Sequence, residues 1–249
     1  MPRIHASLRA LLSNLIDYAG LFPPASLPLG SVIENYERNL ASPESWLLNR
    51  LVLPAARLKE VRLEEHWRVT LVVDSEPGPL PRQVETLETK LPHKLSLPTY
   101  CEAPIEQIED GYAKLRVGGV PLKLIADIAH FVCTAASRRM AFKATAGLHH
   151  AIPSFQRSPQ GHDILAHGFL NLFVAAAFGW QGMEQDAMVT ILEESDPGAF
   201  RFFDNELRWR GSSLTTDQIE SSRLHFAHSF GSCSFEEPIA DLHELGLLP

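Results

Sequence analysis

Cysteine is scarce in this chain of 249 residues, and the few that occur are isolated. Cys101, Cys133 and Cys233 form no C-x-x-C pair, which argues against both a disulfide framework and a thiolate zinc site. The N-terminal residues also lack the apolar core and cleavage pattern of a signal peptide. We therefore expect a protein of a reducing compartment, with a cytoplasmic localisation.

The chain also lacks a long apolar run and an excess of positive charge. Its longest apolar stretch, residues 164–180, is shorter than the ~20 residues that span a bilayer and contains His167 and Asn171. We expect a buried helix there and no membrane partner. The formal net charge of −8 would repel nucleic acid. A small-molecule substrate is the expected partner, and self-association into a homo-oligomer stays open.

What is present is the composition of one folded domain. Hydrophobic residues make up 45% and charged residues 21% of the chain, which is typical of a globular protein. Strand-like runs alternate with helix-like runs, and this predicts a parallel sheet with helical crossovers. We expect strands at residues 14–18, 50–53, 67–73, 94–98, 112–117 and 141–146.

These features predict an α/β fold, a (β/α)8-like barrel that forms a single domain over residues 1–249. After the sixth expected strand the alternation weakens, and residues 200–211 favour a β-hairpin. The barrel could therefore be irregular or incomplete beyond that strand. Helix starts are indicated by three capping-box pairs: Ser31 with Glu34, Thr215 with Gln218, and Ser234 with Glu237.

Two of the expected strands carry cations, although only six of the 22 basic residues of the chain are lysines. In AFKATAG, Lys143 and Thr145 share one face of the strand. In YAKLRVGG, Lys114 and Arg116 share one face in the same way. A parallel strand covered by helices is normally apolar on both faces, so we expect these side chains to point into the barrel and converge near its C-terminal rim.

Carboxylates follow or end other expected strands, at Asp17, Asp74 and Glu102, where they could neutralise the cations. A lysine desolvated beside Arg116 would have its charged form disfavoured, which makes the neutral amine available as a base or Schiff-base nucleophile. The alternative is structural: Lys114 or Arg116 could sit in a buried ion pair or face solvent.

Adjacent histidines, His149 and His150, follow the strand that carries Lys143. On a loop near the cavity mouth they could exchange protons. With Asp17 and Glu102 they could instead bind a metal, although no metal-binding spacing occurs and we expect neither metal nor cofactor. The plainer alternative is that one of them orders the loop by hydrogen bonds.

Two glycine-bearing segments could hold an anionic group of the substrate. Gly118 and Gly119 follow one lysine strand, and Ser232 and Ser234 lie in SFGSCSF, ahead of a short expected helix. Helix N-termini attract anions, and barrels often bind phosphate through their late loops. A plain turn and helix cap is an equally good interpretation of the second segment.

Two segments, LIDYAGLFPPA and FKATAG, resemble class I aldolases of the deoxyribose-phosphate aldolase type. The resemblance implies a (β/α)8 barrel with Lys143 as the imine-forming lysine. The chain departs from that family because its other lysine strand precedes the Schiff-base strand, whereas in the family it follows, and because the family has no counterpart of His149 and His150.

The leading hypothesis is a lyase or isomerase that acts on a small carboxylate- or phosphate-bearing carbonyl compound. Two alternatives stay open: a metal-dependent enzyme, and a barrel that binds a small ligand without transforming it. In the leading hypothesis Lys143 is the nucleophile or base, and Lys114 tunes the reactivity of Lys143. Protons are exchanged by His149 or His150 and by Asp17. The substrate is bound by Arg116, Thr145, Glu102, Gly118, Gly119, Ser232 and Ser234.

Overall fold

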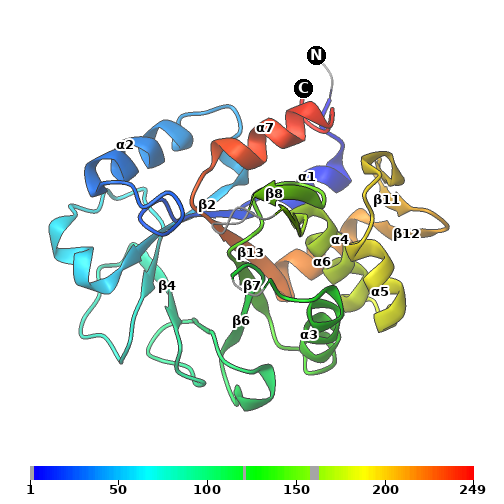
Figure 1. The fold of residues 1–249 in the computed structure, drawn as a ribbon. Helices are drawn as coiled ribbons and strands as arrows, with labels where there is room; N and C mark the ends of the chain where they lie inside the picture. Colours follow the sequence, from blue (N-terminus) through cyan, green and yellow to red (C-terminus); the bar gives the residue numbers. More distant parts are fainter. Residues whose placement is uncertain (1–2, 120–121, 158–162) are drawn as a thin grey trace.

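Eight parallel strands close into a barrel, which confirms the predicted fold (Figure 1). The computed structural model describes residues 3–119, 122–157 and 163–249. Around the barrel the strand order is β1, β13, β7, β6, β5, β4, β3, β2. The strands are β1 (Ile16–Tyr18), β2 (Leu48–Pro54), β3 (Val69–Val72), β4 (Val84–Thr89), β5 (Thr99–Cys101), β6 (Tyr112–Arg116), β7 (Phe142–Thr145) and β13 (Ala227–Ser232).

Helices cover the barrel unevenly. Between β2 and β6 the connections hold only 3-10 turns, η2 (Ala55–Glu60) and η3 (Ile105–Gln107), whereas α3 to α6 gather on one side (Figure 1). The remaining 3-10 turns are η1 (Ser45–Leu47) and η4 (Pro197–Ala199). The α-helices are α1 (Ala6–Leu12), α2 (Leu29–Leu40), α3 (Ile125–Ser137), α4 (Phe169–Trp180), α5 (Gln185–Leu192), α6 (Thr216–His225) and α7 (Glu236–Glu244).

The irregularity expected after the sixth strand is an insertion, and the barrel is complete. Between β7 and β13 the chain forms a two-stranded hairpin of β8 (Ser154–Arg157) and β9 (Asp163–Ala166). It also forms an antiparallel meander of β10 (Phe200–Phe202), β11 (Glu206–Trp209) and β12 (Ser212–Thr215). The predicted hairpin at residues 200–211 is confirmed by the pairing of β10 with β11.

Five of the six predicted strands overlap strands of the barrel, and the remaining one, at residues 94–98, is misplaced. Residues 94–98 precede β5, which begins at Thr99, and both β4 and β13 escaped prediction. In β4, Thr86 and Glu88 are buried although polar, so the segment lacks the apolar pattern of a strand. The segment of Ser232 is the end of β13, where a glycine loop was expected.

The apolar stretch 164–180 is only partly helical, since its first residues belong to β9 and α4 begins at Phe169. Within the part of the chain that is described, no helix has the length and apolar character needed to cross a membrane. The capping box at Thr215 and Gln218 is confirmed at the start of α6. Ser31 lies inside α2, so the box predicted there is wrong. Ser234 accepts a hydrogen bond from the Glu237 backbone at 3.1 Å, but the N-cap residue of α7 is Phe235, so the box predicted there is only half formed.

Packing of β7 against its neighbours fixes which of its side chains face the barrel interior. The outward ring of Phe142 meets Phe131 of α3 and Phe226, with ring centroids 5.4 and 5.1 Å apart. Because side chains alternate along a strand, Lys143 must point inward. The predicted placement of Lys143 and Thr145 on the inner face is confirmed by their contacts, described next.

Candidate functional site

A row of alternating charges runs from the barrel interior to its rim, and it begins at Lys143. The ammonium of Lys143 contacts Asp17 of β1, and it lies 2.5 Å from Oε1 of Glu88 in β4. The side chain of Lys143 is 0% exposed. Its ammonium is therefore shielded from solvent and paired with two carboxylates.

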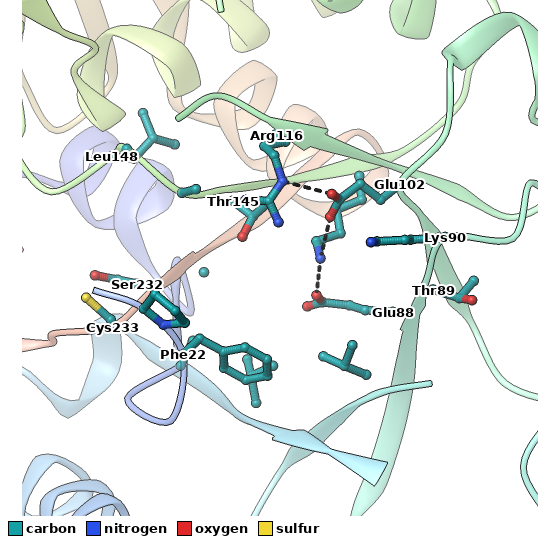
Figure 2. Close-up of a pocket in the computed structure, with 18 of the residues that line it drawn as sticks. Phe22, Glu88, Thr89, Lys90, Glu102, Arg116, Thr145, Leu148, Ser232 and Cys233 are labelled. Atoms are coloured by element: carbon teal, nitrogen blue, oxygen red, sulfur yellow. Dashed lines mark hydrogen bonds and ion pairs between the residues drawn. The ribbon is translucent and has the colours of Figure 1, made fainter. Parts of the chain in front are cut away.

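The row continues through Glu88 to the second lysine strand. Oε2 of Glu88 is 2.8 Å from Nζ of Lys114, and this ammonium is also 2.8 Å from Oε2 of Glu102. The other oxygen of Glu102 accepts a hydrogen bond from Nε of Arg116 at 2.8 Å (Figure 2). We call the six residues Asp17, Lys143, Glu88, Lys114, Glu102 and Arg116 the charge ladder.

Solvent exposure rises steadily along the charge ladder. The exposed fraction of the side chain is 0% at Lys143, 10% at Lys114 and 52% at Arg116. Lys114 of β6 pairs in register with Lys143 of β7, so the two lysines occupy matching positions on adjacent strands. The predicted meeting of both signs of charge at the end of the barrel is confirmed, and so is the alternative that Lys114 takes part in buried ion pairs.

Asp17 anchors the buried end of the ladder. Its Oδ1 accepts hydrogen bonds from Nδ2 of Asn49 at 2.7 Å and from the backbone N–H of Arg50 at 3.2 Å. Its Oδ2 accepts a hydrogen bond from the hydroxyl of Ser229 at 2.7 Å, in addition to the contact with Lys143. The carboxylate is satisfied on both oxygens, which offsets the cost of burying its charge.

Lys143 and Glu88, two neighbouring buried members of the ladder, are held in their charged forms. Burial alone would lower the pKa of Lys143, but the charges of Asp17 and Glu88 outweigh burial and raise it above the ordinary value. Burial alone would raise the pKa of Glu88, but Lys143 and Lys114 lower it to about 2. The expectation that a lysine desolvated beside Arg116 has its charged form disfavoured does not hold for Lys143, because its neighbours are carboxylates, and they stabilise the ammonium.

A cavity of about 380 Å³ opens above the ladder at the C-terminal ends of the strands, where barrel enzymes hold their substrates. Lys114, rather than Lys143, is the ladder lysine that lines it. The predicted site residues in its wall are Lys114, Arg116, Glu102, Thr145, His149 and Ser232, together with Asp74. Among the described residues that form this wall, Gly118, Gly119, His150 and Ser234 do not occur.

The adjacent histidines bind a neighbouring helix. Nδ1 of His149 lies 3.1 Å from Oε2 of Glu237, and Nδ1 of His150 lies 3.0 Å from the carboxylate of Asp241, both in α7. The backbone N–H of Ala151 donates to the same carboxylate at 2.8 Å. His150 therefore orders the loop after β7, as the plainer interpretation had it, and His149 also lines the cavity.

The four ligands of the metal hypothesis have other partners. Asp17 belongs to the buried end of the ladder, Glu102 pairs with two cations, and each histidine pairs with a carboxylate of α7. Across residues 3–119, 122–157 and 163–249, no three His, Cys, Asp or Glu side chains are grouped to hold a metal ion. Nothing in this arrangement supports the metal-dependent alternative.

The glycine-bearing segments serve packing more than anion binding. The backbone N–H of Gly118 donates to the carbonyl of Ala146 at 3.1 Å, so it is not available to a ligand. A Cβ at Gly118 would meet the backbone of Gly147 at 2.7 Å, which explains the absence of a side chain where these two loops cross. Gly119 adopts a positive φ of 134°, a conformation that favours glycine.

The sequence does not predict several residues of the cavity wall, among them Glu88, Lys90 and Phe22. Glu88 could have been found by the pattern that indicates the two lysines: polar residues at alternate positions, here Thr86 and Glu88, share one face of a segment as long as a strand. Residues 84–89 have no apolar face, so the sequence does not predict a strand there. Phe22 lies in the segment that resembled the aldolases, but no pattern in the sequence places it at a cavity.

Comparisons with known proteins add no family to this geometry. The chain matches no family model, and neither curated proteins nor solved structures give a match. The closed barrel confirms the fold that the resemblance to class I aldolases implies, but no family match supports the resemblance itself, so the function must be argued from the site.

Proposed function

We propose that the protein is a lysine-dependent lyase or isomerase, which forms an imine between a small carbonyl compound and Lys114. One observation carries the proposal: Lys114 is a nearly buried lysine in the wall of the cavity, and it shares Glu88 with the fully buried Lys143. A lysine held inside a barrel at the C-terminal end of a strand lies where catalytic groups of this fold are found.

Imine formation leaves the positive charge at Nζ of Lys114 unchanged, and this is the charge that the neighbouring carboxylates of the ladder stabilise. The ammonium of Lys114 and the carbonyl of the substrate give a protonated imine and water, so one positive charge enters the step and one remains. Glu88 and Glu102, each 2.8 Å from Nζ, would stabilise the protonated imine as they stabilise the ammonium. The free amine that attacks arises by transfer of one proton to a neighbouring carboxylate, and that proton returns when the hydroxyl of the carbinolamine leaves as water.

The protonated imine is an electron sink, and this is the chemistry that a lyase and an isomerase share. In a lyase it accepts the electron pair of the breaking C–C bond, and in an isomerase that of a breaking C–H bond. Each reaction needs a group that takes up a proton at the cavity. Glu102 contacts Lys114 and lines the cavity, and His149 lines it as well, so these two are the candidates.

Lys143 suits a positioning role better than attack on a carbonyl. Its ammonium is enclosed by Asp17 and Glu88, and it is absent from the cavity wall. Attack by Lys143 would require breaking two buried ion pairs, which costs several kcal/mol, on the order of 3–5. Imine formation at Lys143, which the aldolase resemblance implies, stays a prediction, and reductive trapping distinguishes it from imine formation at Lys114.

The test is reductive trapping with sodium borohydride and a panel of small aldehydes and oxo acids, read by intact mass. We expect a reduced adduct in the unmodified protein and in Lys59→Met, a control that removes an exposed lysine. Lys114→Met should lose the adduct. Lys143→Met should keep the amine of Lys114 but trap more slowly, because Glu88 loses one of its two cations. An adduct that persists in Lys114→Met would contradict the proposal.

A further inference from the structure

The cavity has two chemically different walls. Strands β4 to β6 provide the polar wall through Glu88, Glu102, Lys114 and Arg116. The segments after β1 and along β2 and β3 provide the apolar wall, with Phe22, Val52 and Val72. In Figure 2 the ring of Phe22 lies on the opposite side of the cavity from Arg116 and Glu102. A ligand that fills this space must be polar at one end and apolar at the other.

Two cations at the rim have capacity for an anionic group. Arg116 donates from Nε to Glu102, and its terminal nitrogens form no hydrogen bond or ion pair with the described residues. Lys90, just after β4, lines the cavity and forms no ion pair within the described part of the chain. Formal charges of the lining, Asp74, Glu88 and Glu102 against Lys90, Lys114 and Arg116, cancel. The lining as a whole therefore has no excess of positive charge to balance a phosphate dianion, whereas Arg116 and Lys90 can pair with one carboxylate.

The usual phosphate site of a barrel is occupied by the chain's own carboxylates. That site would lie at the loops after β7 and β13 and at the N-terminus of α7. The first turn of α7 carries Glu236 and Glu237, which already complement the positive end of its dipole. Ser234 accepts the Glu237 backbone N–H, and Glu237 also pairs with His149. A phosphate there would meet the negative charges of Glu236 and Glu237.

We infer that the ligand of the cavity is a short aliphatic oxo acid, with its carboxylate at Arg116 and Lys90 and its hydrocarbon chain on Phe22, Val52 and Val72. Lys114 and Arg116 are two residues apart on one strand face, about 7 Å along the strand, which suits a carbonyl and a carboxylate that are near neighbours in one molecule. The identity of the reacting carbonyl rests on the proposed function, whereas the binding of a carboxylate with an apolar chain does not.

Binding is measured first, by titration calorimetry with hexanoate and with inorganic phosphate. Hexanoate has no carbonyl to trap, so its affinity is independent of imine chemistry. We expect hexanoate to bind and phosphate to bind at least tenfold more weakly. Phe22→Ala should weaken hexanoate about tenfold or more, because the ring contributes apolar contact area. Phe155→Ala, which removes a phenylalanine 79% exposed, is the matched control and should have no effect.

Reductive trapping then compares 2-oxohexanoate with glyceraldehyde 3-phosphate. We expect faster trapping of 2-oxohexanoate, and loss of this preference in Arg116→Ala but not in Arg62→Ala, whose side chain is 93% exposed. Tighter binding of phosphate than of hexanoate, or a Phe22→Ala variant that binds hexanoate normally, would overturn the inference. Hexanoate binding without any trapped adduct would refute the proposed function and leave the inference standing.

Discussion

Asp17 is 1% exposed, so its carboxylate is stabilised by neighbouring protein groups and not by solvent. Replacing it by Asn keeps the size of the side chain but leaves the ammonium of Lys143 with Glu88 as its single carboxylate partner. We expect Asp17→Asn to lower the free energy of unfolding by about 3–5 kcal/mol, the usual cost of breaking a buried pair. The measurement is urea denaturation at pH 7.

A control for this substitution is Glu60→Gln, which breaks the exposed pair with Arg57. Exposed pairs contribute at most about 1 kcal/mol, so the control should unfold near the unmodified protein. Equal and small losses in the two variants would show that Lys143 does not need Asp17.

Glu88 gives the fold an acid-dependent stability. Its pKa falls from the ordinary 4.5 to about 2 in the folded protein, against the effect of burial, because Lys143 and Lys114 favour the carboxylate. A lowered pKa stabilises the folded state above pH 4.5, and this contribution is lost as the pH falls toward 2. For a shift of this size the loss is on the order of 3 kcal/mol.

We expect the stability advantage of the unmodified protein over Glu88→Gln to shrink steadily between about pH 5 and pH 3 in urea denaturation series. Other carboxylates titrate in both proteins, so the difference between the two isolates Glu88. A difference that stays constant across this range would mean that Glu88 is not paired as described.

At the scale of elements, the contact between the loops after β6 and β7 sets the position of the cavity wall. A Cβ on Gly118 would lie 2.7 Å from Cα and N of Gly147, so Gly118→Ala must separate these loops. We expect a loss of stability of more than about 1 kcal/mol, with weakened hexanoate binding because Arg116 and Thr145 are displaced. Gly30→Ala is the control: nothing lies within 4 Å of its Cβ, so denaturation should show no loss.

Helix starts offer a direct comparison between a real and a mistaken capping box. Thr215 accepts the backbone N–H of Gln218 at 3.2 Å, so Thr215→Ala should destabilise the protein by about 1 kcal/mol. Ser31 lies inside α2, where alanine is the better helix former, so Ser31→Ala should be neutral or slightly stabilising. A loss in Ser31→Ala like that in Thr215→Ala, measured by urea denaturation, would refute the assigned start of α2.

Local pattern was enough for some elements and not for others. The lysine strands were found because Lys143 and Lys114 interrupt segments that otherwise read as apolar strands. In β4 the polar residues Thr86 and Glu88 point inward, so the segment does not look like an apolar strand. In β13 the neighbours of Phe230 are serine and glycine, so that segment has no apolar run either. A strand whose inner face is polar is recognised only when its partners are known.

At the scale of the whole molecule, closure of the barrel is what assembles the charge ladder. Asp17 and Lys143 are 126 positions apart in the chain, and Glu88 and Lys143 are 55 apart. The sequence indicated which residue types would gather at the rim, because parallel strands end at one edge. It could not indicate which lysine would be enclosed by carboxylates and which would reach the cavity, since that depends on pairings between distant strands.

The position of a trapped imine tests the central claim most directly. The unmodified protein is reduced with borohydride in the presence of 2-oxohexanoate, digested, and mapped by mass spectrometry to the modified lysine. We expect the added mass on the peptide that contains Lys114, because this ammonium lines the cavity while Lys143 is fully buried. An adduct on Lys143, or none on any lysine of the folded protein, would contradict the role assigned to Lys114.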